Sequence, residues 1–217
     1  MQLQNLSLVE DDIRRARETD RELSFWKAIL ISIITFGIYA ILVLYRMINR
    51  RDLHFRRQIS LNDDIIKCIK EINSEEERSA DITNELQRAE SLQNEIAKNF
   101  KEKGAIKWLI LNYITLGLAG LYIYYFLTRD FFLFEEKKEE FSTLISSMLV
   151  KLGVVKYPIK PERVMKKRNF WLYLVLSIIT LGIFMFYWYY ILLEEPNHYF
   201  RVGQRWEEQI VNAFRSA

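Results

Sequence analysis

The sequence is poor in the residues that interrupt or cross-link a chain. It has 217 residues but only three prolines, seven glycines and one cysteine. Because Cys68 stands alone, an intrachain disulfide is excluded and a reducing compartment fits. Neither glycine nor proline occurs between Ile38 and Lys103, so long helices are permitted there.

Signatures of catalysis and of cofactor binding are also missing. The chain has no glycine-rich phosphate loop, no nucleophile elbow and no zinc-binding pattern. His54 and His198 are the two histidines, and a metal centre would need further ligands. The paired carboxylates Glu207 and Glu208 lie between apolar positions, which favours a solvated helix face. We therefore predict a protein that is not an enzyme and that has neither a cofactor nor a metal site.

The net charge is small, and charged residues are absent from three apolar runs. The net charge of +3 does not favour nucleic-acid binding. The uncharged runs are Ala28–Tyr45, Trp108–Thr128 and Asn169–Leu193, and about 20 helical residues match a hydrocarbon core of roughly 30 Å. Aromatic residues typical of a bilayer interface border these runs: Trp26, Trp108, Trp171, Tyr45 and Tyr125. The other interpretation is three buried core helices of a soluble protein.

The apolar runs are three copies of one unit. Each contains Thr-x-Gly at its centre, aligned without gaps, as in "SIITFGI" and "SIITLGI". The motif residues are Thr35, Gly37, Thr115, Gly117, Thr180 and Gly182. In each copy an apolar stripe with a spacing of four follows at matched positions, which indicates one face of an amphipathic helix. These predicted tail-helix packing residues are Leu61, Ile65, Ile69, Phe141, Ile145, Leu149, Trp206, Ile210 and Phe214.

This repeat divides the chain into six segments. Residues 1–24 are charged, lack the apolar region of a cleavable signal peptide and form an N-terminal amphipathic segment. Residues 25–72, 105–152 and 169–217 are the three membrane repeats with their tail helices. Residues 73–104 are a cytoplasmic helical connector, with its joint expected at "NSEEERSAD", and residues 153–168 are a proline-containing linker.

Two structures are compatible with each apolar run. In one, the run is a single transmembrane helix that tolerates the glycine. In the other, Thr-x-Gly is the turn of a short helical hairpin that enters one leaflet and returns. Glycine permits positive φ, and the threonine hydroxyl can satisfy backbone groups freed at the turn. Basic residues flank the first two runs on both sides, and hairpins would leave all three tail helices in one compartment, so we favour hairpins.

The motifs resemble a known family. "SIITFGIY" and "SIITLGIF", each after a tryptophan and before a tyrosine-rich half, are similar to the repeated T-x-G-I-Y signature of domain-of-unknown-function family 4234. "NHYFRVGQRWEEQIV" is similar to a tail that follows such segments. The middle copy departs from the signature, with Leu118 and Ala119 where Ile-Tyr is expected. The resemblance implies a prokaryotic membrane protein and implies no activity.

The fold prediction is an all-α membrane protein with three interrupted hydrophobic segments, each followed by an amphipathic helix. We expect a non-enzymatic scaffold at the cell membrane, with its charged regions mainly on the cytoplasmic side. Its expected partners are the lipid bilayer and further copies of itself, so that self-assembly could shape the membrane. The alternative is a three-span transporter or channel subunit, or an accessory protein of one.

Overall fold

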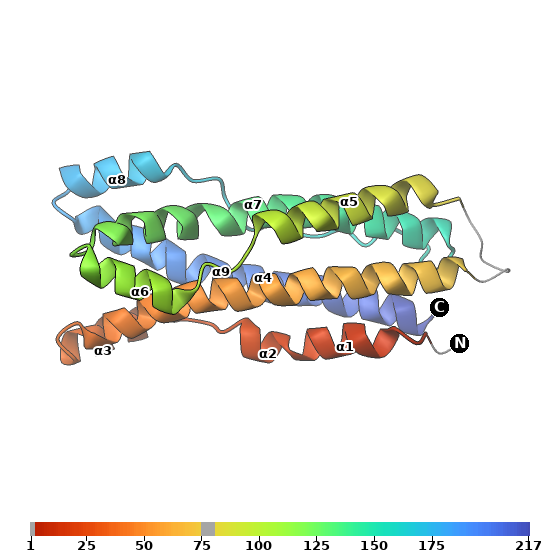
Figure 1. The fold of residues 1–217 in the computed structure, drawn as a ribbon, viewed down its shortest axis with the longest axis horizontal. Helices are drawn as coiled ribbons and strands as arrows, with labels where there is room; N and C mark the ends of the chain where they lie inside the picture. The colour runs from red at the N-terminus through yellow and green to blue at the C-terminus, as the bar shows by residue number, and fades with distance from the viewer. Residues whose placement is uncertain (1–2, 75–80) are drawn as a thin grey trace.

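The computed structural model describes residues 3–74 and 81–217, and every regular element in these ranges is a helix (Figure 1). The predicted all-helical class is therefore confirmed. The elements are α1 (Leu6–Arg14), α2 (Ala16–Thr19), α3 (Phe25–Ile34), α4 (Ile38–Asn73), α5 (Thr83–Asn99), α6 (Ala105–Ile114), α7 (Leu118–Lys151), α8 (Phe170–Ile179) and α9 (Ile183–Arg215).

Each apolar run is divided at its Thr-x-Gly motif into a short helix and the start of a long one. The short helices α3, α6 and α8 have 10 residues each, which corresponds to a length of about 15 Å. The long helices α4, α7 and α9 lead away from the three turns. All three turns lie at one end of the molecule, and both termini lie at the other (Figure 1). We call these the hairpin end and the tail end.

None of the helices in residues 3–74 and 81–217 is both long enough and apolar enough to cross a membrane.

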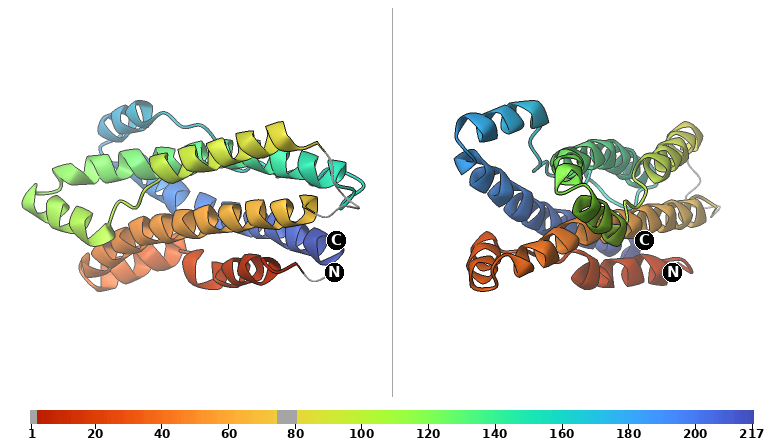
Figure 2. Two further views of the ribbon diagram at one scale, coloured as in Figure 1. Left: turned by 45° about the vertical axis from the view of Figure 1, so that its right-hand side comes forward. Right: turned by 60° about the vertical axis from the view of Figure 1, so that its left-hand side comes forward.

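The three hairpins pack in a cyclic order. The short helix α6 packs on α4, α8 packs on α7, and α3 packs on α9. Each short helix therefore contacts the long helix of the preceding unit, and the first unit contacts the last. The three long helices also contact one another, so the three hairpins and their long helices form one bundle (Figure 2).

The tail end has a continuous apolar core. Within it, Phe55 and Phe134 stack with ring centroids 4.2 Å apart. Cys68 is buried in it as well. The whole predicted stripe lies in this core: Leu61, Ile65, Ile69, Phe141, Ile145, Leu149, Trp206, Ile210 and Phe214. The stripe thus stabilises the fold of a single chain. A homo-oligomer, which stays a prediction, would need another surface.

The connecting segments return the chain from the tail end to the hairpin end. Residues 1–24 contain α1 and α2, which pack on α4. In the connector, α4 ends at Asn73 and α5 begins at Thr83, while residues 75–80 of the predicted joint lie outside the described part. The linker 153–168 has no regular element, as its two prolines predict.

Candidate functional site

The backbone reverses at each Thr-x-Gly motif through two residues with positive φ. The glycines Gly37, Gly117 and Gly182 have φ of 88°, 94° and 90°. The residue before each glycine is also left-handed, with φ of 49°, 50° and 49° at Phe36, Leu116 and Leu181. Glycine takes this conformation freely, but a side chain there costs about 1–2 kcal/mol. The sequence pointed to the glycine and missed the strained apolar residue beside it.

The threonine hydroxyl joins the two helices of the first hairpin. Its Oγ1 donates to the Ile31 carbonyl at 2.7 Å in the short helix. The same oxygen accepts the backbone N–H of Tyr39 at 3.1 Å in the long helix. The Gly37 N–H bonds back to the Ser32 carbonyl at 2.7 Å, which closes the short helix in the manner of a Schellman motif. The first free N–H groups of the long helix therefore have partners inside the turn.

The other two turns repeat these hydrogen bonds. Thr115 Oγ1 donates to the Leu111 carbonyl at 2.8 Å and accepts from the Ala119 N–H at 2.9 Å. Thr180 Oγ1 donates to the Leu176 carbonyl at 2.7 Å and accepts from the Phe184 N–H at 2.9 Å. The middle copy keeps the turn although its sequence departs from the signature, because these bonds use only the threonine side chain and the backbone.

The turns present apolar side chains to the outside. Phe36 is 97% exposed, and Leu116 and Leu181 are each 94% exposed. Their apolar neighbours on both sides of each turn are exposed as well: Ile34, Ile38, Ile114, Leu118, Ile179 and Ile183. We call these nine residues the hairpin tips. Burial of one such side chain contributes roughly 1.5–3 kcal/mol of free energy, so the tips lack a large stabilisation as long as they are exposed to water.

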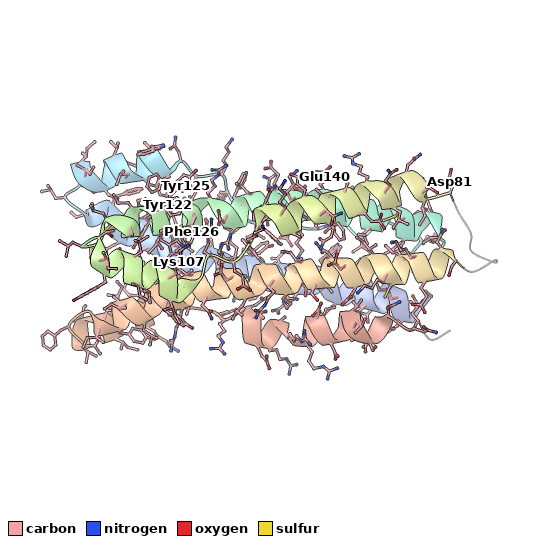
Figure 3. All side chains as sticks on the ribbon, viewed as in Figure 1. Asp81, Lys107, Tyr122, Tyr125, Phe126 and Glu140 are labelled. Carbon is pink, nitrogen blue, oxygen red and sulfur yellow. The ribbon has the colours of Figure 1, made fainter. Side chains whose placement is uncertain are left out.

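The predicted interfacial aromatic residues lie in two environments. Trp26 and Trp171, near the starts of α3 and α8, are 69% and 68% exposed. Trp108 is half-buried and stacks on Tyr122 at 4.8 Å between ring centroids. Figure 3 shows the cluster around Tyr122 at the hairpin end, far from Asp81 at the tail end. Tyr45 and Tyr125 are half-buried and pack against the apolar core of the hairpin end.

Polar side chains of the long helices bind the backbone of the next unit. The Asp52 carboxylate accepts the N–H groups of Lys103 and Gly104 at 2.8–3.0 Å, just before α6. Asn197, at the same register position in α9, accepts the Leu23 N–H at 3.1 Å, just before α3. These bonds fix where α6 and α3 begin.

A group of buried charged residues joins the three units within the tail-end core. In α4, Arg57 pairs with Asp20 at 2.8 Å and with Glu207 of α9 at 2.7 Å. Lys138 of α7 lies 3.5 Å from Glu207. Two cations and two carboxylates, from all three units, thus form one group. We call Asp20, Arg57, Lys138 and Glu207 the charged layer.

Burial and pairing act in opposite directions on the pKa values of this layer. Burial would raise the pKa of Glu207, but Arg57 and Lys138 outweigh it and hold that pKa below the ordinary value. Burial lowers the pKa of Lys138, and Glu207 opposes that shift. Burial also lowers the pKa of His54, whose Nδ1 lies 2.8 Å from Asp20. A neutral His54 can donate its Nδ1–H to the Asp20 carboxylate, so the histidine has a structural role here.

Several inferences from the sequence need correction at this layer. Glu207 was predicted on a solvated face, but it is buried because Arg57 and Lys138 reach it from the other units. Arg50 and Arg51, which count as basic flank residues in the sequence, are buried as well. The sequence does carry a signal for these buried polar positions, because two positions of the repeat are non-apolar in all three units. One position is held by Gln58, Lys138 and Gly203, and the other by Asn62, Ser142 and Glu207. The two histidines do not meet, since His54 is buried and His198 is exposed.

The third hairpin carries a family match. Residues 168–211 match a family model described as a domain of unknown function, DUF4234. The resemblance expected from "SIITLGIF" is thereby confirmed for this part of the chain, which contains α8 and most of α9. The likeness of the first two hairpins to DUF4234 stays a prediction. No curated protein and no solved structure matches the chain.

Proposed function

We propose that the protein is a non-enzymatic scaffold anchored in one leaflet of the cell membrane by its three hairpins. The observation that carries this proposal is the exposure of Phe36, Leu116 and Leu181 at turns that all lie at one end of the molecule (Figure 1). A large exposed apolar surface is typical of a binding site for protein or membrane. A lipid leaflet can cover all three separated tips at once.

The dimensions of the hairpins suit one leaflet. Each short helix is about 15 Å long, which is half of a hydrocarbon core of roughly 30 Å. A tip inserted to that depth returns to the side from which it entered. The three long helices would then leave the membrane together, with the tail end in the cytoplasm.

The turns also meet the hydrogen-bonding requirement of a lipid environment. Unpaired backbone groups cost several kcal/mol in hydrocarbon, so irregular backbone must satisfy itself internally. At the first turn the N–H groups of Phe36, Gly37 and Ile38 bond to carbonyls of the same hairpin. The Thr35 hydroxyl then satisfies Tyr39. This arrangement supports insertion without a neighbouring protein to shield the turn.

Residues at the base of the hairpins suit an interface with lipid headgroups. Trp26 and Trp171 are exposed there, each next to or near basic residues in sequence. The exposed Lys107 lies near the start of α6, at the base of the second hairpin (Figure 3). The exposed Arg129 donates to the phenol of Tyr125. Aromatic and basic residues at this depth would favour anionic lipids.

A flotation experiment with Leu181→Asp tests the anchor. In vesicles of phosphatidylcholine and phosphatidylglycerol, an aspartate deep in the leaflet costs about 2.5–3.5 kcal/mol. We expect vesicle binding to fall on the order of 100-fold, and by more in a triple variant that also carries Phe36→Asp and Leu116→Asp. Folding should be unaffected, because all three side chains are exposed.

The matched control is Leu8→Asp, an exposed leucine on α1 at the other end of the molecule. It should float with vesicles as the unchanged protein does. If Leu181→Asp and the triple variant also float unchanged, the tips do not enter the membrane and the proposal is wrong.

A further inference from the structure

We propose that the groove between the first and third hairpins binds one hydrocarbon chain of a membrane lipid. This inference rests on the proposed membrane anchor and adds a specific lipid site to it. The groove has a volume of about 400 Å³, within the range of small-molecule sites. All three units contribute to its lining, which includes Ile29, Ala40, Leu44, Tyr124, Met185 and Tyr189.

The groove exists because two of the interfaces between hairpins are filled differently. Between the second and third hairpins, Trp188 packs on Tyr124 at 5.1 Å and Tyr125 packs on Phe170 at 5.3 Å. Between the first and third, the contacts of Phe25 with Tyr189 and Tyr190 close only the base. Above that base the first and third hairpins diverge toward their tips (Figure 2).

The lining selects an uncharged, apolar occupant. No Asp, Glu, Lys, Arg or His is among the residues that line the groove. Its polar side chains are Ser32, Tyr124 and Tyr189. An extended peptide would bring a row of backbone N–H and C=O groups, and these few hydroxyls could not satisfy them. A second helix, about 10 Å wide, is much bulkier than a single hydrocarbon chain, which needs no hydrogen-bond partner.

The two ends of the groove differ in polarity, as the two ends of a lipid do. One end is at Gly182, beside the fully exposed tip residue Leu181. The other end is at Tyr189, about 10 Å along α9. The geometry places an acyl chain toward the tip and the ester oxygens of the lipid near the two phenols.

Native mass spectrometry of the full chain tests this site. The chain is reconstituted into vesicles of equal parts palmitoyl-oleoyl phosphatidylcholine and phosphatidylglycerol and then extracted in mild detergent. We expect one phospholipid to stay bound per chain. Ala40→Trp fills the groove and should lower the lipid-bound fraction at least about tenfold. Leu121→Trp, on an exposed position of the second hairpin outside the lining, should retain the lipid.

Flotation of the same three proteins separates the two proposals. Ala40→Trp and Leu121→Trp should both float as the unchanged protein does, because each adds apolar surface. If the unchanged chain floats but retains no phospholipid, or if Ala40→Trp retains as much as Leu121→Trp, the groove does not hold a lipid. A lipid-free dimer would overturn the inference in favour of a second chain in the groove. If the unchanged chain does not float, the membrane anchor itself is wrong.

Discussion

The hairpin end and the tail end are built from the same three long helices but place their apolar residues differently. In the tail end of α9, Trp206, Ile210 and Phe214 are buried, whereas Glu208, Gln209 and Asn212 between them are exposed. At the hairpin end of the same helix, Ile183 and Phe186 are exposed. A helix with one apolar face suits a boundary between core and water, whereas a helix that is apolar all round suits an apolar surrounding. One continuous helix thus serves two environments.

The charged layer lies within the tail end, where it joins the three units. Arg57, in α4, contacts groups from the N-terminal segment and from α9. Buried ion pairs contribute little net stability against apolar replacements, but they are costly to break. The layer therefore fixes the relative positions of the three units more than it strengthens the fold.

The largest expected effect is at this layer. We expect Arg57→Met to lower the free energy of unfolding by about 3–5 kcal/mol, because Asp20 and Glu207 would stay buried without the guanidinium that pairs with both. Denaturant titration followed by circular dichroism measures the change.

Arg205→Met is the matched control. Arg205 pairs with Glu162 at 3.2 Å, but both side chains are 63% exposed. Its loss should change the free energy of unfolding by no more than about 0.5 kcal/mol. Equal losses in the two variants would mean that the charged layer is solvated.

The same substitution at the two ends gives the next largest effect. Ile145→Ala removes a fully buried side chain from the tail-end core and should cost about 2–5 kcal/mol of unfolding free energy. Ile38→Ala, at an exposed tip, should change that free energy by less than about 0.5 kcal/mol. It should instead weaken vesicle binding, since it removes apolar surface that would enter the leaflet.

Denaturant titration and vesicle flotation of both isoleucine variants measure this contrast. If Ile38→Ala destabilised the fold as much as Ile145→Ala, the tips would be packed inside the protein, and the difference between the two ends would disappear.

The smallest effect is expected at the turn itself. Gly37→Ala should lower the free energy of unfolding by about 1–2 kcal/mol, because φ of 88° is unfavourable for a side chain. Beyond the two neighbouring residues in the chain, no atom lies within 4 Å of the added Cβ, so the cost comes from the backbone conformation. Gly37→Asn should lose less, because asparagine adopts this conformation more readily.

Thermal unfolding of the two glycine variants, repeated at Gly182, measures this effect. If Gly37→Ala and Gly182→Ala are as stable as the unchanged protein, positive φ does not explain the glycine in the motif.

The apolar periodicity of the sequence was enough to identify which face of each tail helix is apolar. Its spacing of four placed Leu61, Ile65 and Ile69 on one side of α4, and they are buried together. It could not identify their partners, because helices that pack within one chain and helices that pack between two chains show the same apolar pattern. The structure places the partners in the same chain.

Glu207 illustrates what periodicity misses. A polar residue between apolar positions is solvated by default, and only its pairing makes burial tolerable. Arg57 is 150 residues away in the sequence. Local pattern carries no information about such a pairing.

The sequence by itself determined the turns, because their hydrogen bonds join residues that are close in the chain. Thr35 reaches Ile31 and Tyr39, four residues on either side, and Gly37 supplies the positive φ. Only the tertiary structure decided the cyclic packing of the hairpins, the charged layer and the open groove. These features depend on contacts such as that between α3 and α9, whose partners are brought together only when the three units assemble.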